Sequence, residues 1–441
     1  MINIFWFRRD LRLEDNAGLY HALKSKNPVL PIFVFDTNIL DKLENKADAR
    51  VMFIHDTITE LNEKLSKFGS SIIVKYGEPQ DVWQSLLKEY NINAVFTNRD
   101  YEPYALNRDK ATEKLLEENN ISLHTFKDHV LFEKDEVLKK DGNPYTVFTP
   151  YSKTWRKKLE SKIEPDGTFY YFKPYPTEKY FSNFYSIDKQ SIIPLEKMGF
   201  ERSAIEIPSK TVTQGIIKNY GEKRNFPGIK GTSRLGIHFR FGTISIREKA
   251  RKADKLSKTY LNELIWRDFY SQILGHFPQV VNEPFRAKYS FIEWRDSEED
   301  FKKWCEGKTG YPMVDAGMRE LNATGFMHNR VRMLTASFLT KHLLLNWQLG
   351  EAYFAEKLLD FDLASNNGGW QWAAGCGTDA APYFRIFNPE SQMKKFDKDL
   401  RYVKKWVPEY GTSRYPKPIV EHKFARERCL KTYKDGLAKS S

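Results

Sequence analysis

Residues 2–35, "INIFWFRRDLRLEDNAGLYHALKSKNPVLPIFVF", begin and end in short apolar runs that are separated by a polar stretch. Apolar runs of this length predict strands that are buried on both faces, here at 2–7 and 29–35. Further runs of the same kind lie at 71–77, 94–98 and 122–126. Between the second and third runs, apolar residues recur at spacings of three and four, which predicts a helix over 51–68. The repeated alternation of strand and helix predicts an α/β fold with a doubly wound parallel sheet in residues 1–130.

The rest of the chain divides into two parts. Residues 131–205 show no regular period and are rich in tyrosine, proline and lysine, so we predict a long connector there. Beyond residue 205 the strand patterns stop and helical patterns take over. The longest of these patterns lie at 257–274, 311–325, 329–347 and 350–362. We therefore predict an all-α second domain over 206–441.

Composition narrows the class of protein. With 41% hydrophobic and 29% charged residues in 441, the chain reads as an ordinary globular protein, and no apolar run approaches the ~18 residues of a membrane span. The N-terminus lacks the layout of a secretory signal, so we expect a cytoplasmic protein that makes no use of a membrane. The three cysteines are far apart in the sequence, which indicates neither a disulfide framework nor a metal site. The net charge of +12 favours a polyanionic partner, although a basic surface alone would give the same charge.

A pair of hydroxyl residues opens the helical domain. Thr232 and Ser233 precede an apolar stretch, a placement that suits the N-terminus of a helix. They are interpreted either as a simple helix cap or as part of a phosphate site, because free N–H groups and the helix dipole attract anions there.

Two helical segments carry side chains that suit recognition of a nucleobase. On a helix, Glu263 and Trp266 share a face, where the carboxylate can bond a base edge and the indole can stack on it. The alternative is a surface ion pair between Glu263 and Arg267 beside a core tryptophan. Asn329 and Met333 likewise share a face and offer an amide and a polarizable apolar contact; the alternative is a helix with an ordinary basic face.

The most unusual stretch is "LDFDLASNNGGWQWAAGCGTDAAPYFRIFNP", residues 359–389. Two asparagines, two glycines and two tryptophans fall within seven positions of it. We interpret the glycines as a close approach of the backbone to a ligand, with asparagine amides that meet the polar edges of a ring such as isoalloxazine. An Asn-Gly turn between helices is the alternative.

Together these segments resemble the photolyase and cryptochrome family, and most closely the class I cyclobutane pyrimidine dimer photolyases. The resemblance rests on "FWFRRDLRLEDN", "NRDYEPYALNRD", "GNPYTVFTPY" and "NNGGWQWAAGCGTDAAPYFRIFNP" and covers nearly the whole chain. It implies an α/β antenna domain over 1–130 and a helical catalytic domain over 206–441 that binds FAD and DNA, joined by the connector 131–205.

The resemblance also implies the FAD contacts. The matching positions are Tyr220, Thr232, Ser233, Arg234, Leu235, Arg267, Asn329, Arg332, Asp360, Asp362 and Asn366. Gly236 is also expected to contact FAD, but only through its backbone, because this chain has Gly-Ile where the family usually has Ser-Pro. By this resemblance Thr232, Ser233 and Arg267 meet the phosphates, and Arg332 pairs with Asp360 beside the flavin ring. Asn366 faces flavin N5, where an amide oxygen can accept a hydrogen bond from the N5–H of the reduced flavin.

The positions that contact a flipped pyrimidine dimer in the family match as well. They are Arg224, Glu263, Trp266, Asn329, Met333 and Trp372. The implied activity is that of a deoxyribodipyrimidine photo-lyase, a carbon–carbon lyase for DNA repair: blue light drives an electron from reduced FAD to the dimer, the ring splits, and the electron returns. Glu263 is expected to stabilise the charge that develops on the dimer, and Trp370, Trp347 and Trp294 match the family's electron-transfer chain to oxidised flavin.

Two other functions share the same motifs. One is a cryptochrome-type blue-light photoreceptor, for which a changed lesion pocket would be expected, and the other is a (6-4) photolyase, for which histidine would be expected in the pocket. We also expect DNA with pyrimidine dimers as the partner, a monomer, and association with the nucleoid when DNA is bound. A second antenna chromophore of the folate or deazaflavin type is possible by resemblance, and no metal is expected.

Overall fold

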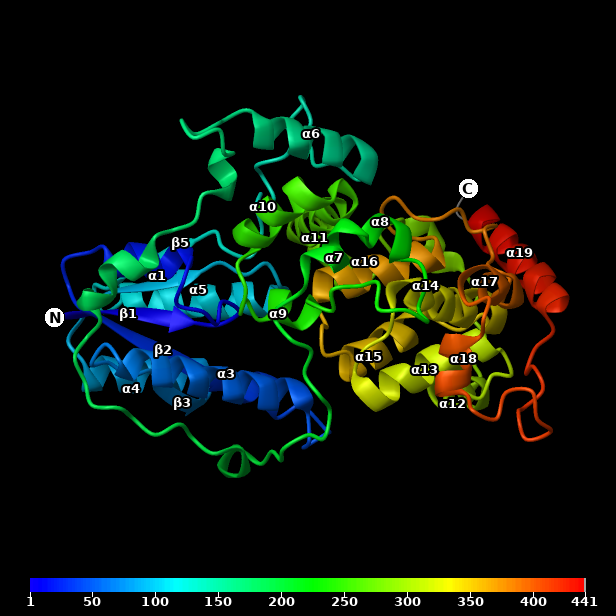
Figure 1. Ribbon diagram of the computed structural model, residues 1–441, viewed down its shortest axis with the longest axis horizontal. Helices are drawn as coiled ribbons and strands as arrows, with labels where there is room; N and C mark the ends of the chain where they lie inside the picture. The colour runs from blue at the N-terminus through cyan, green and yellow to red at the C-terminus, as the bar shows by residue number, and fades with distance from the viewer. Residues whose placement is uncertain (440–441) are drawn as a thin grey trace. The chain divides into compact units, whose positions relative to one another are not determined.

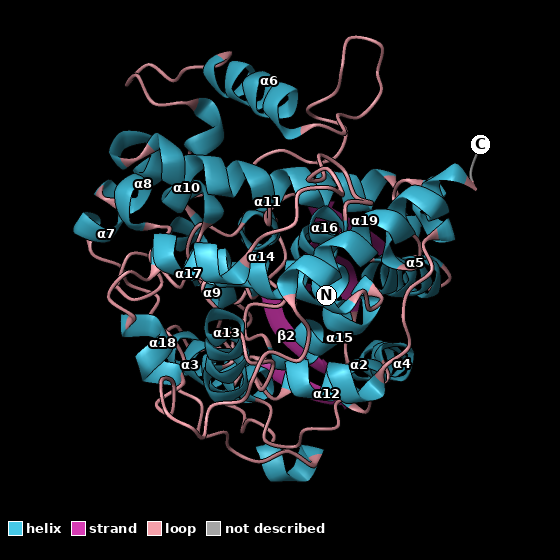
Figure 2. Cartoon of the chain, turned by 90° about the vertical axis from the view of Figure 1, so that its right-hand side faces the viewer, coloured by secondary structure: helices cyan, strands magenta, loops and turns pink. Residues whose placement is uncertain are grey.

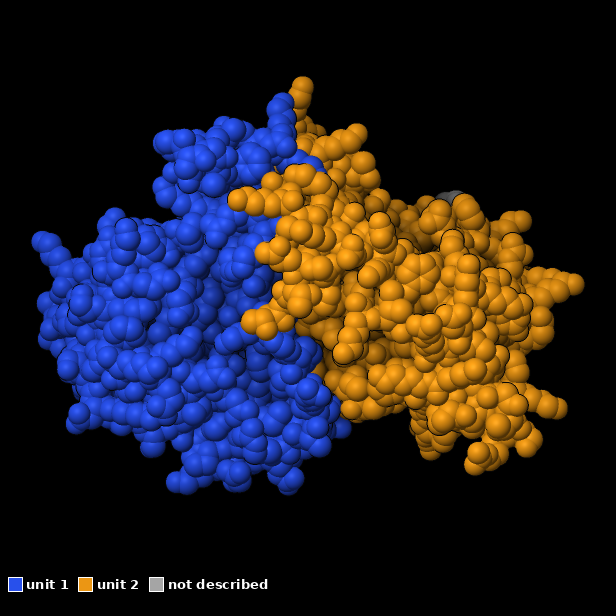
Figure 3. All heavy atoms as spheres, viewed as in Figure 1, with its two compact units in different colours: residues 1–133, 156–210, 235–252 blue, residues 134–155, 211–234, 253–441 orange. Residues whose placement is uncertain are grey.

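The computed structural model describes residues 1–439, which form two compact units (Figure 3). Unit 1 contains residues 1–133, 156–210 and 235–252, and unit 2 contains residues 134–155, 211–234 and 253 onward. No helix within 1–439 is long and apolar enough to cross a membrane.

Unit 1 is built on a five-stranded parallel sheet (Figure 1). Its strands are β1 (Ile2–Phe7), β2 (Val29–Asp36), β3 (Ile73–Gly77), β4 (Ile92–Asn98) and β5 (Ser122–Phe126). Their spatial order is β3-β2-β1-β4-β5, and every neighbouring pair is parallel. The predicted α/β fold is therefore confirmed, and each predicted apolar run lies on one of these strands to within a few residues.

Helices cover both faces of the sheet, which explains why the strands are apolar without alternation. The helices of this unit that follow strands are α1 (Ala17–Leu23), α2 (Thr37–Leu40), α3 (Ala49–Ser66), α4 (Pro79–Glu89) and α5 (Pro103–Glu117). Trp6 of β1 meets Trp83 of α4 edge to face, with ring centroids 5.4 Å apart. On the other face, Phe5 packs so tightly against α1 that a Cβ on Gly18 would lie 2.9 Å from its ring.

Buried ion pairs hold the remaining segments of unit 1 against the sheet. The Asp128 carboxylate accepts from Arg12 and from Arg247, each at 2.7 Å, and Arg247 also bonds Asp15 at 2.8 Å. The other elements in this unit are the short turns η1 (Tyr170–Phe172), η2 (Thr177–Asn183) and η3 (Leu195–Met198), and α9 (Gly236–Arg240). Helices α6 (Phe148–Glu160) and α10 (Ile246–Leu256) each contribute residues to both units.

Unit 2 is helical, as predicted (Figure 2). Its helices are α7 (Gln214–Lys218), α8 (Tyr220–Lys223), α11 (Lys258–His276), α12 (Glu298–Cys305), α13 (Pro312–Thr324), α14 (Asn329–Ser337), α15 (Trp347–Lys357), α16 (Leu363–Ala374), α17 (Pro389–Phe396), α18 (Arg401–Trp406) and α19 (His422–Ala438). Short turns η4 (Pro278–Val281) and η5 (Ala287–Phe291) and a π-helical segment η6 (Phe338–Leu343) complete it. One large apolar core joins α12 to α19 and includes Trp304, Trp347 and Trp370.

In two places the structure differs from what the local pattern suggested. Residues 363–374, which contain "NNGGWQW", form helix α16, so the alternative of an Asn-Gly turn is wrong. The helix forms despite two glycines because Asp362 caps its first turn, accepting from the Ser365 N–H at 3.1 Å, and because its buried side pairs with α11, α14 and α15. Helix α6 also lies within a segment that we expected to lack regular structure; its buried residues Phe148, Tyr151 and Trp155 have helical spacing, and Pro150 sits in the first turn, where proline is tolerated.

Candidate functional site

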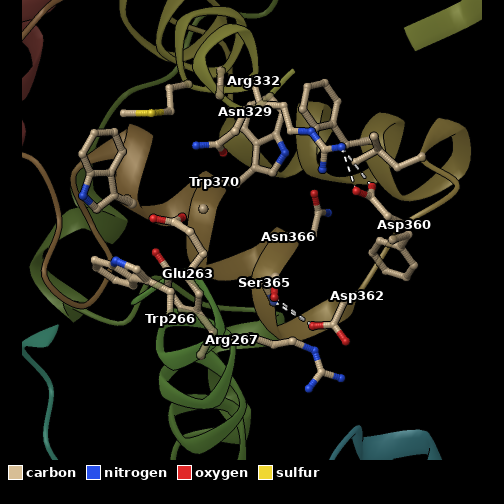
Figure 4. Close-up of a pocket in the computed structure, with 18 of the residues that line it drawn as sticks. Glu263, Trp266, Arg267, Asn329, Arg332, Asp360, Asp362, Ser365, Asn366 and Trp370 are labelled. Carbon is tan, nitrogen blue, oxygen red and sulfur yellow. Dashed lines mark hydrogen bonds and ion pairs between the residues drawn. The ribbon is translucent and has the colours of Figure 1, made fainter. Parts of the chain in front are cut away.

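A cavity of about 430 Å³ opens in unit 2 between α11, α14, α15 and α16 (Figure 4). Twelve of the predicted site residues line it: Arg224, Glu263, Trp266, Arg267, Asn329, Arg332, Met333, Asp360, Asp362, Asn366, Trp370 and Trp372. The cavity is also lined by Tyr270, Ala336, Phe354, Leu358, Phe361, Ser365 and Gly369. The structure therefore brings predicted residues of α11, α14 and α16, together with Arg224, Asp360 and Asp362, into one space.

An ion pair lies on one side of the cavity. The Nη2 atom of Arg332 donates to both carboxylate oxygens of Asp360, at 3.0 and 2.9 Å, and its Nε donates to the carbonyl of Met327 at 2.7 Å. Bonds from two of its nitrogens, Nη2 and Nε, hold the planar guanidinium in one orientation. Arg332 and Asp360 thus present a fixed positive and negative group side by side, as the resemblance implied.

The amide of Asn366 is oriented by α15. Its Nδ2 atom donates to the backbone carbonyl of Glu351 at 3.0 Å and lies 3.3 Å from Glu351 Oε1. Because the nitrogen is engaged by these acceptors, the amide oxygen is the atom left to meet a ligand. Burial raises the pKa of Glu351, and the hydrogen bond from Asn366 acts in the opposite direction.

Glu263 is the one acidic side chain of α11 that lines the cavity, and it forms an ion pair with Arg224. The two side chains are equally exposed, each at 29%. Burial raises the pKa of Glu263, while the charge of Arg224 and its hydrogen bond act in the opposite direction. Glu263 therefore pairs with Arg224, and not with Arg267 as the alternative interpretation of the sequence had it.

Aromatic rings form another part of the wall. Trp266 comes from α11, and Trp370 and Trp372 come from α16, two positions apart and therefore on different faces of that helix. Trp266 has Tyr270 beside it, with ring centroids 5.4 Å apart. Trp370 contacts Phe354 at 5.0 Å and Trp304 at 6.0 Å, and its ring rests on Gly350, where a Cβ would lie 2.1 Å from it.

The two glycines of "NNGG" have different surroundings. A Cβ on Gly368 would lie 2.2 Å from the ring of Tyr270, so this glycine allows α16 to approach α11 closely. A Cβ on Gly369, which lines the cavity, would have no contacting atom within 4 Å in the described chain. Only Gly369 therefore fits the expectation that glycine leaves room for a ligand.

Eight of the predicted site residues do not line the cavity. They are Tyr220, Thr232, Ser233, Arg234, Leu235, Gly236, Trp294 and Trp347. The predicted helix-capping role of Thr232 and Ser233 was wrong, because helix α9 starts only at Gly236 and Leu235 stands at its cap position without a capping side-chain bond. Arg234, with a φ of +52°, turns the chain before the helix begins. Within unit 2, Ser233 instead accepts from the Tyr260 hydroxyl at 3.0 Å, and Tyr260 packs edge-on against Tyr220.

Two tryptophans of the predicted electron-transfer chain lie elsewhere in unit 2. Trp347 is buried as the first residue of α15, one turn before Gly350. Trp294 is half-buried before α12 and meets Tyr433 edge to face, with ring centroids 5.9 Å apart.

Sequence reasoning missed two residues at the site. Tyr270 stands one helical turn after Trp266 and lines the cavity, and Glu351 orients Asn366 from α15. The i, i+4 spacing from Trp266 was a usable signal for Tyr270. Nothing in the sequence pairs Glu351 with Asn366, because that contact joins two helices.

Comparisons with known proteins identify the family of the chain. Residues 3–168 match the family described as DNA photolyase, and residues 260–413 match the FAD binding domain of DNA photolyase. A deoxyribodipyrimidine photo-lyase from Halobacterium salinarum is 34% identical over 482 aligned residues, which span 97% of this chain and 98% of the relative. Two solved structures are also similar. A class III photolyase from Agrobacterium tumefaciens has a TM-score of 0.82 at 32% identity, with 100% of this chain and 98% of that one covered.

The other solved structure is an archaeal photolyase from Sulfolobus tokodaii with two FAD molecules, which has a TM-score of 0.82 at 33% identity and covers 99% of this chain and 100% of that one. The chain belongs to the DNA photolyase and cryptochrome family. The predicted enzyme class, deoxyribodipyrimidine photo-lyase, and the predicted FAD-binding domain are confirmed.

Proposed function

We propose that the chain repairs cyclobutane pyrimidine dimers in DNA in a light-driven reaction that depends on bound FAD. The observation that carries this proposal is a single cavity lined by all six predicted lesion contacts and by six of the twelve predicted flavin contacts. The names of the relatives support DNA photolyase chemistry in general, and the choice of the pyrimidine dimer as the lesion rests on the cavity.

The residues of the cavity fit FAD. Arg332, Asp360 and the oxygen of Asn366 offer donor and acceptor groups for the polar edge of a flavin, and Gly369 leaves open space beside them. Arg267 adds a cation for the phosphates. Bound reduced FAD would supply the light-driven electron that splits the dimer and would take the electron back afterwards. The chain itself binds the group, orients it and excludes water from it.

The lesion contacts have the chemistry that a flipped dimer needs. The indoles of Trp266 and Trp372 can stack on the two bases, which returns about 1–3 kcal/mol per base, and a dimer unpairs at reduced cost because it already pairs poorly. Burial raises the pKa of Glu263, and its protonated carboxyl can donate a hydrogen bond to a thymine carbonyl, which stabilises the negative charge that develops there while the proton stays on Glu263.

A (6-4) photolyase is less favoured than a pyrimidine dimer photolyase, because no histidine is among the residues that line the cavity. His328 caps α14, where its Nδ1 accepts from the Arg330 N–H at 3.2 Å, and burial lowers its pKa to about 4. A cryptochrome-type function has no specific observation in its favour.

The decisive experiment mixes the purified, reduced protein with an oligonucleotide that carries one thymine dimer, under blue light and in the dark. We expect restored thymines only in the light. Absence of light-dependent repair would contradict the proposal, and repair of a (6-4) photoproduct instead would reassign the lesion. The absorption spectrum of the same preparation reports FAD and any antenna chromophore, and its elution volume tests the proposed monomer.

A separate test concerns electron supply. We propose that Trp370, Trp347 and Trp294 pass electrons to oxidised flavin, because Trp370 lines the cavity and Trp294 is half-buried. Trp294→Phe should then slow photoreduction of the oxidised protein at least tenfold and leave repair by chemically reduced protein unchanged. Equal loss of both activities would exclude a role confined to electron supply.

A further inference from the structure

The indole of Trp266 has one face covered by the protein. The ring of Phe148 lies flat against it, with centroids 3.6 Å apart and an angle of 3° between the planes. Phe148 is 6% exposed and does not line the cavity. Because one face is covered, only the opposite face and the edges of the Trp266 ring can meet a ligand in the cavity.

The first two turns of α6 are fastened to α11 around this contact. Trp155 donates its indole N–H to Asp268 at 2.9 Å, and both groups are buried. Tyr151 packs on Phe269, with ring centroids 5.2 Å apart. Phe148, Tyr151 and Trp155 share one face of α6, and this face packs against Trp266, Asp268 and Phe269 of α11.

A second link reaches Phe148 from the segment that follows α16. Asp379 accepts a hydrogen bond from the backbone of Phe148. Asp379 adopts a φ of +48°, a left-handed conformation that is uncommon for a residue other than glycine and is held here by its surroundings. This bond ties the backbone at Phe148 to the segment that follows α16.

We propose that Phe148 is a positioning residue for lesion recognition: its ring fixes the plane of Trp266, so that the free face of the indole is ready for the flipped base. The inference rests on the proposed function, because it assumes that Trp266 stacks on the lesion. Preorganisation of this kind lowers the entropy that the side chain loses on binding, which increases affinity for the damaged base and leaves contacts to undamaged DNA unchanged.

The test compares Phe148→Leu, which fills much of the space without a flat ring, with Phe148→Tyr, which keeps the ring. Phe338→Leu is the matched control, because Phe338 is likewise a buried phenylalanine of unit 2, and it contacts Tyr311 and His342 and not Trp266. Affinities for an oligonucleotide with one thymine dimer and for its undamaged counterpart are measured in the dark, together with FAD content and thermal stability.

We expect Phe148→Leu to weaken binding of the dimer about three- to tenfold, as loss of one aromatic pair would. Binding of undamaged DNA and FAD content should not change, and Phe148→Tyr should restore the affinity. In a Trp266→Ala background the Phe148→Leu change should have no further effect on dimer affinity, because Phe148 acts through Trp266.

Equal weakening on both DNAs, loss of FAD, or an undiminished effect in the Trp266→Ala background would overturn the inference. Unchanged dimer affinity in Phe148→Leu would overturn it as well. If the wild-type protein neither prefers the dimer nor repairs it, the proposed function is wrong. If the wild-type protein repairs the dimer and Phe148→Leu binds it equally well, only the inference about Phe148 is wrong.

Discussion

Gly368 and Gly369 are neighbours on α16 and differ in what an added methyl group would meet. Alanine at 369 places a Cβ in open space beside the cavity and should stabilise the helix by up to ~1 kcal/mol. Alanine at 368 collides with the ring of Tyr270 and should destabilise the fold by about 1–3 kcal/mol. If FAD fills the space at Gly369, Gly369→Ala should lower the FAD content and keep the stability of the apoprotein.

Absorbance of FAD per protein and thermal unfolding of the flavin-free protein check both variants. Full FAD content in Gly369→Ala would mean that the cofactor does not approach α16 at this position.

The raised pKa of Glu263 should make the affinity for the dimer depend on pH. Because burial raises the pKa of this carboxyl, its protonated form persists to higher pH than that of an exposed glutamate. If the protonated carboxyl donates to the lesion, affinity for the dimer is full below this pKa and is lost as the pH rises through it. Arg224 acts to lower the pKa of Glu263, so Arg224→Gln should move the midpoint to higher pH.

The groups that face Glu263 do not interfere with this titration. Burial raises the pKa of Tyr220, Tyr260 and Tyr270 above the ordinary tyrosine value, so these rings stay neutral. Dimer affinity relative to undamaged DNA, measured from about pH 5 to 9, gives the midpoint. Glu263→Gln should give a flat profile with FAD retained; a profile unchanged by this substitution would assign the titration to another group.

Among the helices, α16 carries three of the predicted site residues, Asn366, Trp370 and Trp372, so the stability of its N-terminus should affect the site directly. Asp362 caps it through the N–H of Ser365 at 3.1 Å and the Ser365 hydroxyl at 3.0 Å. Asp362→Ala should cost about 1 kcal/mol of unfolding free energy, within the usual 0.5–2 for a lost cap.

Asparagine is as good a cap as aspartate, so Asp362→Asn should keep the stability and remove only the charge. Chemical denaturation of both variants gives the free energy of unfolding and so the contribution of the cap. Flavin titration of the same proteins gives the affinity for FAD and so the effect of the charge. A loss of stability in Asp362→Asn equal to that in Asp362→Ala would show that the charge, and not the cap, stabilises the helix.

The sequence predicted elements well where their periodicity was strong. All five strands and the helical nature of unit 2 follow from apolar patterns. The alternative of an Asn-Gly turn at residues 366–372 was wrong, because packing of α16 against α11, α14 and α15 outweighs the local preference of two glycines and two asparagines for a turn. Contacts that join elements, such as Glu351 to Asn366 and Phe148 to Trp266, leave no trace in a single sequence, and the resemblance to a family supplied the site residues that local patterns could not.

The whole molecule carries a net charge of +12, which should attract the phosphates of DNA in the proposed complex. Each phosphate that a cation neutralises releases counterions, so the logarithm of the affinity falls with the logarithm of the salt concentration by about 0.9 per contact on duplex DNA. A charge spread over the surface contributes to attraction at long range, whereas a cation at the cavity adds one definite contact.

Arg224, which lines the cavity and is 29% exposed, is the cation best placed to leave Glu263 for a phosphate. Arg224→Gln should therefore reduce the magnitude of the salt slope by about 0.9. Lys431→Gln is the control, because Lys431 is 80% exposed on α19 and does not line the cavity. Binding of dimer-containing duplex is measured at several salt concentrations and constant pH. An equal change of slope in both variants would mean that Arg224 acts only through the total charge of the protein, and an unchanged slope in Arg224→Gln would place no phosphate at the mouth of the cavity.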